Sequence, residues 1–191
     1  MTNVIGLCGL AGAGKSVAAD ALETLGYERV KFSMFLKDML RAFFRACGLA
    51  ETEIERRIEG DLKETPDVLL GGKTPRYAMQ TLGTDWGREL IAKDIWSMAW
   101  RAKAESALAA GGKIVAEDVR FGTEDSEVHR LGGNVVRMFR PDGVLNVGGH
   151  ASEMFEDVNP DLTIINNGTI EELREKVIDL FGEPDARKVA A

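Results

Sequence analysis

The chain has 191 residues, of which 45% are hydrophobic and 29% are charged. This composition is typical of a folded protein and excludes a disordered chain, and the length predicts one domain with room for a small inserted subdomain. Its 24 basic residues stand against 31 acidic ones, which gives a formal net charge of −7. Because a protein that binds the DNA or RNA backbone needs a basic face, this charge argues against a nucleic acid polymer as partner.

Cysteine and histidine are rare in this sequence. The two residues of each type lack the spacing of a zinc or redox motif. The chain starts without the basic segment of a signal peptide, and no apolar run approaches the roughly 20 residues of a membrane-spanning helix. We therefore expect a cytoplasmic protein with no membrane partner. Cys47 and the apolar helix around it are expected in the core, with a homodimer contact as the alternative.

Short apolar runs rich in β-branched residues alternate with longer stretches of helical period, which predicts a parallel sheet covered by crossover helices. The five predicted strands are at about residues 4–8, 29–33, 113–119, 134–139 and 162–165. The predicted helices are at about residues 15–25, 34–47, 51–60, 75–110 in two or more pieces, 123–131 and 170–181. The fold class that follows is α/β, with right-handed crossovers.

The second and third predicted strands are separated by a long helical excursion. Residues 34–112 are too many for a single crossover, so we expect a helical insertion over one end of a sheet core made by about 1–33 and 113–182. Together these segments form one predicted domain over residues 1–182. The tail at 183–191 has nothing apolar to bury and is expected to fray.

Directly after the first strand, residues 9–16 read Gly-Leu-Ala-Gly-Ala-Gly-Lys-Ser, a full match to the pattern GxxxxGK[ST]. Glycines let backbone N–H groups point inward, and the helix that follows adds its positive end, so such a loop binds polyphosphate. Lys15 would bind the β and γ phosphates of ATP, and the Ser16 hydroxyl would ligate Mg²⁺. The alternative is a glycine-rich turn with an exposed lysine. The predicted nucleotide-binding residues of this loop are Gly9, Gly12, Ala13, Gly14, Lys15, Ser16 and Val17.

The third predicted strand ends in two acids followed by an arginine. Ligands of parallel sheets bind outside the carboxyl ends of the strands, which is where Glu117, Asp118 and Arg120 fall. Asp118 is therefore the predicted magnesium ligand, and Arg120 is predicted to bind a phosphate. The alternative is that the three side chains neutralise one another at a loop.

A P-loop alone does not name a reaction, and the sequence lacks the NKxD segment by which switch GTPases read guanine. We therefore look for a phosphate-acceptor site, and the inserted segment is where we predict it. Thr74 and Pro75 begin a helix as cap and first residue. If that helix is continuous, one face carries Arg76, Gln80, Gly83 and Gly87. A glycine inside a helix costs about 1 kcal/mol relative to alanine, so two glycines on one face need an explanation. Close approach of a flat ligand would explain them, with Arg76 binding the phosphate of that ligand and Gln80 its base. The alternative is a helix that ends near Gly83 and restarts.

Other residues of the insertion allow two interpretations. Trp86 is expected either to pack in the core or to stack on the acceptor base. Ser33 and Lys37, at the end of the second strand and the start of the next helix, are candidates for binding the acceptor, although Lys37 also suits a solvated surface. The apolar residues of that helix are expected in the core: Phe35, Leu36, Met39, Leu40, Phe43 and Phe44.

The segment after the fourth strand is polar and rich in glycine. Residues 140–153 are therefore expected to form a lid that excludes water from the transferring phosphate. Arg137 and Arg140 would neutralise charge on that phosphate, or else form surface ion pairs. The loop at 166–169 could hold the adenine of ATP through Asn167, or could serve only as a turn and a helix cap.

Taken together, the segments GLAGAGKS, FSMFLKDML, GKTPRYAMQTLGTDWGREL, AEDVRF, HASE and the Asn-Gly-Thr at 167–169 resemble the bacteriophage-type deoxynucleoside monophosphate kinases, over about residues 4–180. The resemblance implies a P-loop NTPase fold of the nucleoside-monophosphate-kinase kind, and transfer of the γ-phosphoryl group of ATP to a deoxynucleoside monophosphate (dNMP) with Mg²⁺. By position it assigns Lys15 and Ser16 to ATP and metal. It also implies roles at the acceptor or at the phosphates for Lys37, Arg76, Gln80, Arg88, Asp118 and Arg120.

Ser16 departs from this resemblance, because some relatives carry an acid there, so their metal geometry is not transferred. Two other functions stay open. One is a P-loop kinase that resembles dephospho-coenzyme A kinase and phosphorylates a hydroxyl, and the other is a nucleotide-binding switch without catalysis. Arg76 and Arg88 favour a phosphate acceptor, since a hydroxyl acceptor needs a nearby base.

Overall fold

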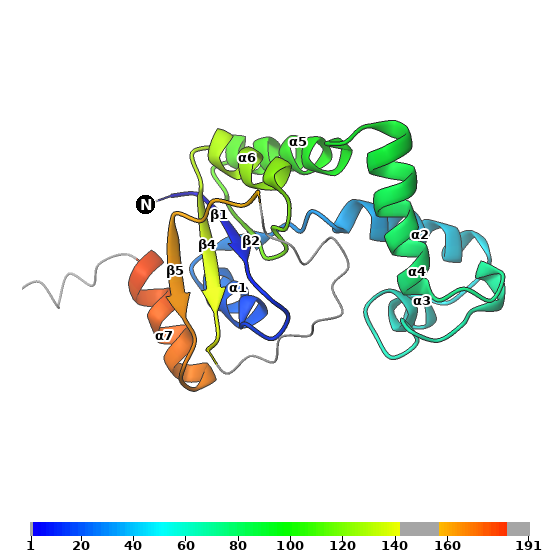
Figure 1. Ribbon diagram of the computed structural model, residues 1–191, viewed down its shortest axis with the longest axis horizontal. Coiled ribbons are helices and arrows are strands. Elements are labelled where there is room, and N and C mark those ends of the chain that lie inside the picture. Colours follow the sequence, from blue (N-terminus) through cyan, green and yellow to red (C-terminus); the bar gives the residue numbers. More distant parts are fainter. Residues whose placement is uncertain (1, 142–156, 183–191) are drawn as a thin grey trace, which may run out of the picture. The chain divides into compact units, whose positions relative to one another are not determined.

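The computed structural model describes residues 2–141 and 157–182 (Figure 1). Within these ranges the chain forms one parallel sheet of five strands in the order β2-β3-β1-β4-β5, so the predicted sheet is confirmed. The expected lid, apart from Arg140 and Pro141, and the expected tail lie outside the described residues. The strands are β1 (Val4–Cys8), β2 (Tyr27–Arg29), β3 (Lys113–Ala116), β4 (Asn134–Phe139) and β5 (Leu162–Ile165).

The central strand β1 is buried along its whole length, because helices cover both faces of the sheet. On one face, α1 (Lys15–Thr24) and α7 (Ile170–Phe181) bury a core that includes Ile5, Leu7, Leu22, Val136 and Leu173. On the other face, α6 (Gly122–Arg130) approaches so closely that a Cβ on Gly6 would lie 3.0 Å from Val128. Burial on both faces explains the continuous apolar run in the sequence of β1.

The prediction for the second strand was wrong. β2 covers Tyr27–Arg29, whereas residues 29–33 were predicted. Gly26, at a φ of 86°, turns the chain into the strand early, and the hydroxyl of the buried Tyr27 donates a 2.6 Å hydrogen bond to the carbonyl oxygen of Thr2. After Val30, whose N–H still bonds to Val115, the chain leaves the sheet. β3 is also shorter than predicted, since it ends at Ala116 rather than at residue 119.

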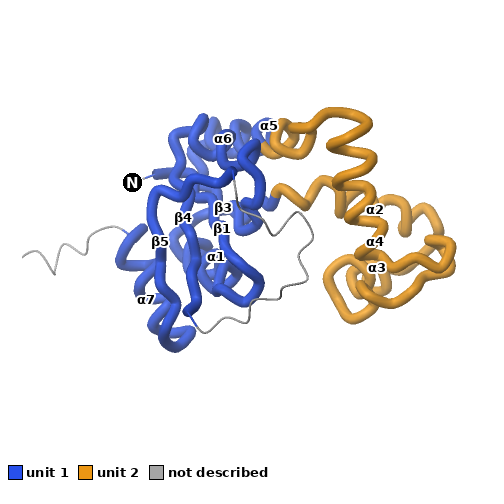
Figure 2. The backbone as a smooth tube through the Cα atoms, in the orientation of Figure 1, with its two compact units in different colours: residues 1–31, 101–191 blue, residues 32–100 orange. Residues whose placement is uncertain are grey.

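The chain divides into two compact units (Figure 2). Residues 1–31 and 101–191 make the first, which holds the sheet, and residues 32–100 make the second. The second unit contains α2 (Met34–Ala46), α3 (Glu51–Ile58), the short 3₁₀-helix η1 (Val68–Leu70), α4 (Pro75–Thr81) and the π-helix η2 (Leu82–Ile91). The helix α5 (Ile95–Ala109) begins in the second unit and continues in the first. No helix within the described ranges has the length and apolar character needed to cross a membrane.

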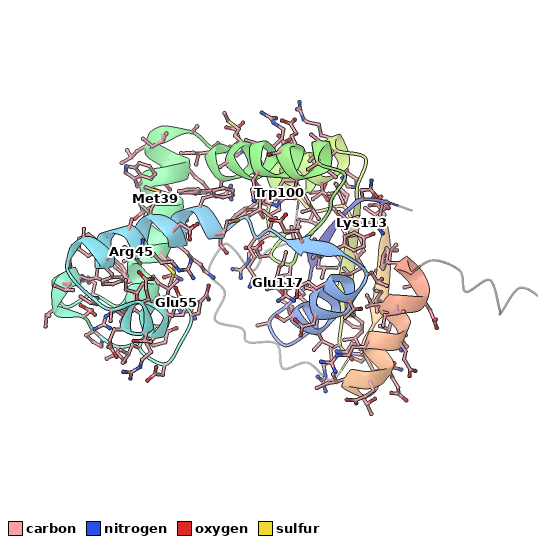
Figure 3. All side chains as sticks on the ribbon, turned by 180° about the vertical axis from the view of Figure 1, so that it is seen from behind. Met39, Arg45, Glu55, Trp100, Lys113 and Glu117 are labelled. Carbon is pink, nitrogen blue, oxygen red and sulfur yellow. The ribbon has the colours of Figure 1, made fainter. Side chains whose placement is uncertain are left out.

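A small apolar core holds the second unit together, made by Leu40, Phe44, Ile54, Ile58 and Met79. Of the six apolar residues of α2 that were expected in the core, the structure buries Leu40 and Phe44, and Leu36 packs against the same core while partly buried. Met39, labelled in Figure 3, and Phe43 are 41% and 42% exposed. Cys47 is exposed too, so its predicted core position is wrong. Because α2 packs against the core along one side only, the apolar residues on its other side stay exposed.

The helix that begins at Pro75 continues through Gly83 without a break, so the alternative of an end there is wrong. It changes from α to π winding at Leu82. Gly83 and Gly87 are buried: the indole of Trp96 lies against Gly87, and a Cβ on Gly83 would lie 3.2 Å from Leu36 Cδ2. A Cβ on Gly87 would lie 2.6 Å from that ring, and Trp96 Nε1 donates a 2.7 Å hydrogen bond to the Gly83 carbonyl oxygen. The two glycines therefore serve packing inside the second unit.

Candidate functional site

The loop at residues 9–16 joins the carboxyl end of β1 to the first turn of α1. All three of its glycines have positive φ angles: 133° at Gly9, 78° at Gly12 and 101° at Gly14. These angles favour glycine because a side chain rarely adopts them. Gly14 stands at the N-cap of α1, and no side-chain hydrogen bond among the described residues caps that helix end. The loop therefore presents backbone N–H groups at a helix N-terminus, the arrangement that binds phosphate.

Close neighbours also fix two of these glycines. A Cβ on Gly9 would collide with the carbonyl oxygen of Met138. A Cβ on Gly14 would lie 2.7 Å from both Asn166 Nδ2 and Leu173 Cδ2. At Gly12, by contrast, a Cβ would meet no heavy atom within 4 Å. The loop is thus packed against β4 and the β5–α7 turn on one side and open on the other.

Lys15 turns its ammonium group back onto this loop. Its Nζ donates hydrogen bonds of 2.6 Å to the carbonyl oxygen of Gly9 and of 2.9 Å to that of Leu10. Burial, and after it the positive charge of Arg120, lowers the pKa of Lys15, while Glu117 and Asp118 act in the opposite direction. The lysine, the arginine and the two acids predicted to share one site therefore lie within electrostatic reach of each other.

Asn166 connects the end of β5 to the loop. Its Nδ2 donates a 3.1 Å hydrogen bond to the buried carbonyl of Ala13, and its own side chain is buried. Asn167, which sequence analysis assigned to the adenine, is exposed, and its Oδ1 accepts a 3.2 Å hydrogen bond from Lys176. The structure therefore places the neighbour of the predicted residue against the loop.

A cavity of about 500 Å³ opens between the loop and the β5–α7 turn. Its lining is mostly polar or glycine on the side of the loop and includes Leu173 on the side of α7. Such a combination suits a nucleotide, whose phosphates and base need different surroundings. The lining residues are Gly12, Gly14, Lys15, Ser16, Val17, Arg140, Asn166, Gly168, Thr169, Ile170 and Leu173.

Glu117, the first of the two acids after β3, pairs with basic residues other than Arg120. Glu117, labelled in Figure 3, is buried and ion-paired with Lys31, and its Oε2 lies 3.5 Å from a guanidinium nitrogen of Arg29. Asp118 is half-buried, and Arg120 is exposed. The backbone of this loop is held by the buried carboxylate of Glu124, which accepts hydrogen bonds of 2.7 Å from Arg120 N and 3.2 Å from Phe121 N.

Arg137 lies opposite Cys8 in the pairing of β4 with β1, next to the start of the loop. Burial raises the pKa of the Cys8 thiol, while the charge and hydrogen bond of Arg137 and the charge of Lys15 act against it. Arg140 lines the cavity instead. The two predicted arginines thus occupy different places along the loop, at its start and at its cavity side.

Six of the residues predicted to bind the acceptor lie in the second unit, whereas Asp118 and Arg120 lie in the first. Lys37 Nζ is 2.7 Å from Glu59 Oε1, and Arg76 is ion-paired with Glu64. Arg88 donates a 3.2 Å hydrogen bond to the Lys93 carbonyl oxygen. Ser33 is the N-cap residue of α2, Gln80 is half-buried on α4, and Trp86 is 37% exposed with its ring 6.2 Å from that of Trp96.

Sequence analysis gave no individual role to three residues at these sites: Lys63, Glu124 and Asn166. Asn166 is the direct neighbour of the predicted Asn167, and the pattern of the sequence does not show which of the two side chains points toward the loop. Glu124 offered the best signal, because an acid three residues after a strand-to-helix loop can accept hydrogen bonds from its backbone.

A phosphate-cradling loop at the carboxyl end of the central strand of a parallel sheet defines the class of P-loop α/β enzymes. Comparison with known proteins narrows the class. The deoxynucleotide monophosphate kinase family matches residues 71–177. A putative deoxynucleotide monophosphate kinase of Acanthamoeba polyphaga mimivirus is 32% identical over 187 residues, which span 92% of this chain and 94% of that protein. The chain belongs to the deoxynucleotide monophosphate kinase family and is an ATP-dependent nucleotide kinase.

Among solved structures, a dephospho-CoA kinase from Campylobacter jejuni superimposes with a TM-score of 0.51 at 14% identity, over 96% of this chain and 97% of that one. At this level of identity the likeness shows the fold alone. It confirms the P-loop kinase architecture, and it gives no support to a hydroxyl acceptor.

Proposed function

We propose that this kinase transfers the γ-phosphoryl group of ATP to the phosphate of a dNMP, giving ADP and a deoxynucleoside diphosphate. The acceptor oxygen forms a bond to the γ-phosphorus as the bond from that phosphorus to the β-γ bridging oxygen breaks. The observation that carries the proposal is the half-buried Lys15 beside Arg120, on a phosphate-cradling loop that borders a nucleotide-sized cavity. Family membership supports the choice of acceptor.

On the donor side, the backbone N–H groups of the loop bind the phosphates of ATP, and the cavity toward α7 receives its adenosine. Lys15 exchanges its two carbonyl partners for phosphate oxygens, which are stronger acceptors because they are charged. Arg120, Arg137 and Arg140 supply further positive charge. Phosphoryl transfer depends mainly on positioning and on such charge neutralisation.

Mg²⁺ fits the oxygen donors at this site. The hydroxyl of Ser16 and the carboxylate of Asp118 are hard ligands of the kind that magnesium prefers, and Asp118 lies within electrostatic reach of Lys15 in the adjoining loop. Ser16 and Asp118 are the residues that would hold the ion. When bound, Mg²⁺ would share the negative charge of the phosphates.

On the acceptor side, Lys37 and Arg76 are the proposed phosphate ligands, and Gln80, Arg88, Ser33 and Trp86 are proposed to position the nucleoside. A phosphate monoester is mostly a dianion at neutral pH, so it attacks without a general base. This reaction therefore needs cations for the acceptor rather than a proton acceptor. The ion pairs of Lys37 and Arg76 show that both side chains already hold carboxylate anions.

An ADP-release assay tests the proposal with dAMP, dCMP, dGMP, dTMP, the four corresponding ribonucleotides and dephospho-coenzyme A, each offered with Mg·ATP. We expect at least one dNMP to accelerate ADP release far above the rate without acceptor. Acceleration by dephospho-coenzyme A alone, or slow hydrolysis that no acceptor changes, contradicts the proposal. The first result indicates a hydroxyl acceptor, and the second indicates a switch.

A further inference from the structure

Lys63, to which sequence analysis gave no role, belongs to a group of cations in the second unit. Lys37 comes from α2, Lys63 from the turn after α3, and Arg76 from the first turn of α4. The Arg76 N–H donates a 3.0 Å hydrogen bond to the carbonyl oxygen of Lys63, which joins two of these elements directly. We call Lys37, Lys63 and Arg76 the three-cation cluster.

Carboxylates hold the members of the three-cation cluster. The two oxygens of Glu59 divide between the lysines, with Oε1 2.7 Å from Lys37 Nζ and Oε2 3.9 Å from Lys63 Nζ. Glu64 pairs with Arg76. The side chains of Glu59 and Glu64 are 43% and 63% exposed, so both carboxylates are accessible to solvent.

The charges of this group do not balance. Three cations face two carboxylates, which leaves an excess of one positive charge (3 − 2 = +1). Arg41 also approaches Glu59, at 3.6 Å, but it forms its short bonds with Glu55 and Asp38. With Arg41, Glu55 and Asp38 counted as well, the wider network is neutral (4 − 4 = 0), so the excess positive charge is confined to the three-cation cluster and its two carboxylates.

Lys63 is the most informative member of the cluster. Its side chain is only 22% exposed, although a lysine is ordinarily well solvated. Burial, the charge of Lys37 and the charge of Arg76 lower the pKa of this amine, while Glu59 and Glu64 act against that change. A partly buried lysine next to two other cations costs free energy, and such costs are found where an anionic ligand offsets them.

We propose that Lys63 is a further substrate-binding residue, which together with Lys37 and Arg76 binds the phosphate of the acceptor nucleotide in place of the carboxylates of Glu59 and Glu64. The inference rests on the proposed function, since it names the residues of the same acceptor site. A phosphate monoester dianion carries nearly the charge of the two carboxylates that it replaces. Its oxygens can accept from two ammonium groups and a guanidinium at the same time.

The two glutamates then act as internal competitors of the substrate. They keep the three cations in place before binding, and each must leave its cation when the phosphate arrives. Removal of a cation should weaken acceptor binding, whereas removal of a competing carboxylate should strengthen it. This opposite sign distinguishes the proposal from a purely structural ion-pair network, in which both changes would reduce stability without favouring the substrate.

Steady-state kinetics with the dNMP that reacts fastest tests this inference. For Lys63→Met we expect the KM for the dNMP to rise about tenfold or more, with the KM for ATP unchanged. Lys63→Arg should recover much of the loss, and Glu59→Gln should lower the KM for the dNMP. Lys103→Met is the matched control. Lys103 lies on α5, is 44% exposed and pairs with Glu28 on β2, so its replacement should leave both KM values unchanged.

A binding measurement separates this inference from the proposed function. Calorimetric titration with 2-deoxyribose 5-phosphate, which carries the phosphate without a base, should give heat with the wild type and little with Lys63→Met. A dNMP KM for Lys63→Met equal to that of the wild type overturns the inference while the kinase activity stands. Binding of 2-deoxyribose 5-phosphate that needs Lys63, in an enzyme that accepts no dNMP, contradicts the proposed function and supports the cluster. Urea unfolding of each variant shows whether a loss of binding comes from misfolding. If Lys63→Met does not fold, Lys63→Arg replaces it as the test.

Discussion

Replacement of Asn166 by alanine removes the hydrogen bond between the end of β5 and the phosphate-binding loop. The Nδ2 group donates to the Ala13 carbonyl oxygen at 3.1 Å, and Asn166 and Ala13 are only 6% and 4% exposed. Water therefore has little access to the carbonyl that the substitution leaves without its donor. A buried acceptor without a partner costs about 1–3 kcal/mol, and we expect the free energy of unfolding of Asn166→Ala to fall by that amount.

The same substitution should weaken ATP binding, because the loop is no longer held in the conformation that cradles the phosphates. If the binding free energy of Mg·ATP falls by about 1.4 kcal/mol, the Kd for Mg·ATP rises about tenfold. Asn167→Ala is the matched control, since that side chain is exposed and bonds only to Lys176 among the contacts described. Its unfolding free energy should change by less than about 0.5 kcal/mol.

Urea unfolding and calorimetric titration with Mg·ATP measure both effects on the wild type and the two variants. An Asn167→Ala enzyme that loses more ATP affinity than Asn166→Ala refutes this reasoning. That result would support the adenine contact that sequence analysis assigned to Asn167.

Three further predictions follow from the structure. Lys15→Ala should lower kcat by about 10²–10³ while its circular dichroism spectrum stays that of the wild type, and near-normal turnover contradicts the role of this lysine. Gly87→Ala places a Cβ 2.6 Å from the Trp96 ring, so the free energy of unfolding should fall by about 1–3 kcal/mol. The midpoint of urea unfolding measures this loss, and an unchanged midpoint contradicts the close contact. Burial lowers the pKa of His129, but Asp161 and Asp125 outweigh burial and raise the pKa above 6.5. The ion pairs of protonated His129 therefore stabilise the fold fully below pH 6.5, and this stabilisation is lost as the pH rises through the pKa of the folded state. His129→Gln should flatten the fall of the unfolding free energy above pH 6.5, and a variant with the slope of the wild type contradicts the assignment.

The parts of the fold that the sequence predicted correctly are those with a strong local signal. The bounds of β1, β4, β5 and α7 agree with the predictions, because buried β-branched runs and a Thr169 cap with its Glu172 partner mark them clearly. β2 failed because it is only three residues long, and its start is fixed by the turn at Gly26 and by a hydrogen bond from Tyr27 to the distant Thr2. No local pattern records that contact.

The glycine pair shows how a correct pattern can receive a wrong cause. The spacing of Gly83 and Gly87 correctly indicated a continuous helix, and both glycines have close neighbours. At Gly87 that neighbour is the ring of Trp96, nine residues later in the sequence, and at Gly83 it is the side chain of Leu36. A sequence contains no sign that distinguishes an indole of the same chain from the base of a substrate.

At the candidate site, the residues within one motif could be predicted, and the residues that support them from elsewhere could not. The pattern GxxxxGK[ST] identified Lys15 and Ser16 without any structure. The support given by Asn166 depends on where β5 ends, and the place of Lys63 depends on how three elements of the second unit meet. Such contacts are tertiary, so only the fold reveals them.

Phosphorus NMR of the enzyme with Mg·ATP and the dNMP that gives the fastest ADP release follows the transferred group itself. We expect the signals of ATP and the dNMP to be replaced, in equal amounts, by those of ADP and a deoxynucleoside diphosphate, with no growth of inorganic phosphate. A γ-phosphoryl group that appears only as inorganic phosphate, or as a monoester on a sugar hydroxyl, would show that the protein does not phosphorylate the phosphate of a nucleotide.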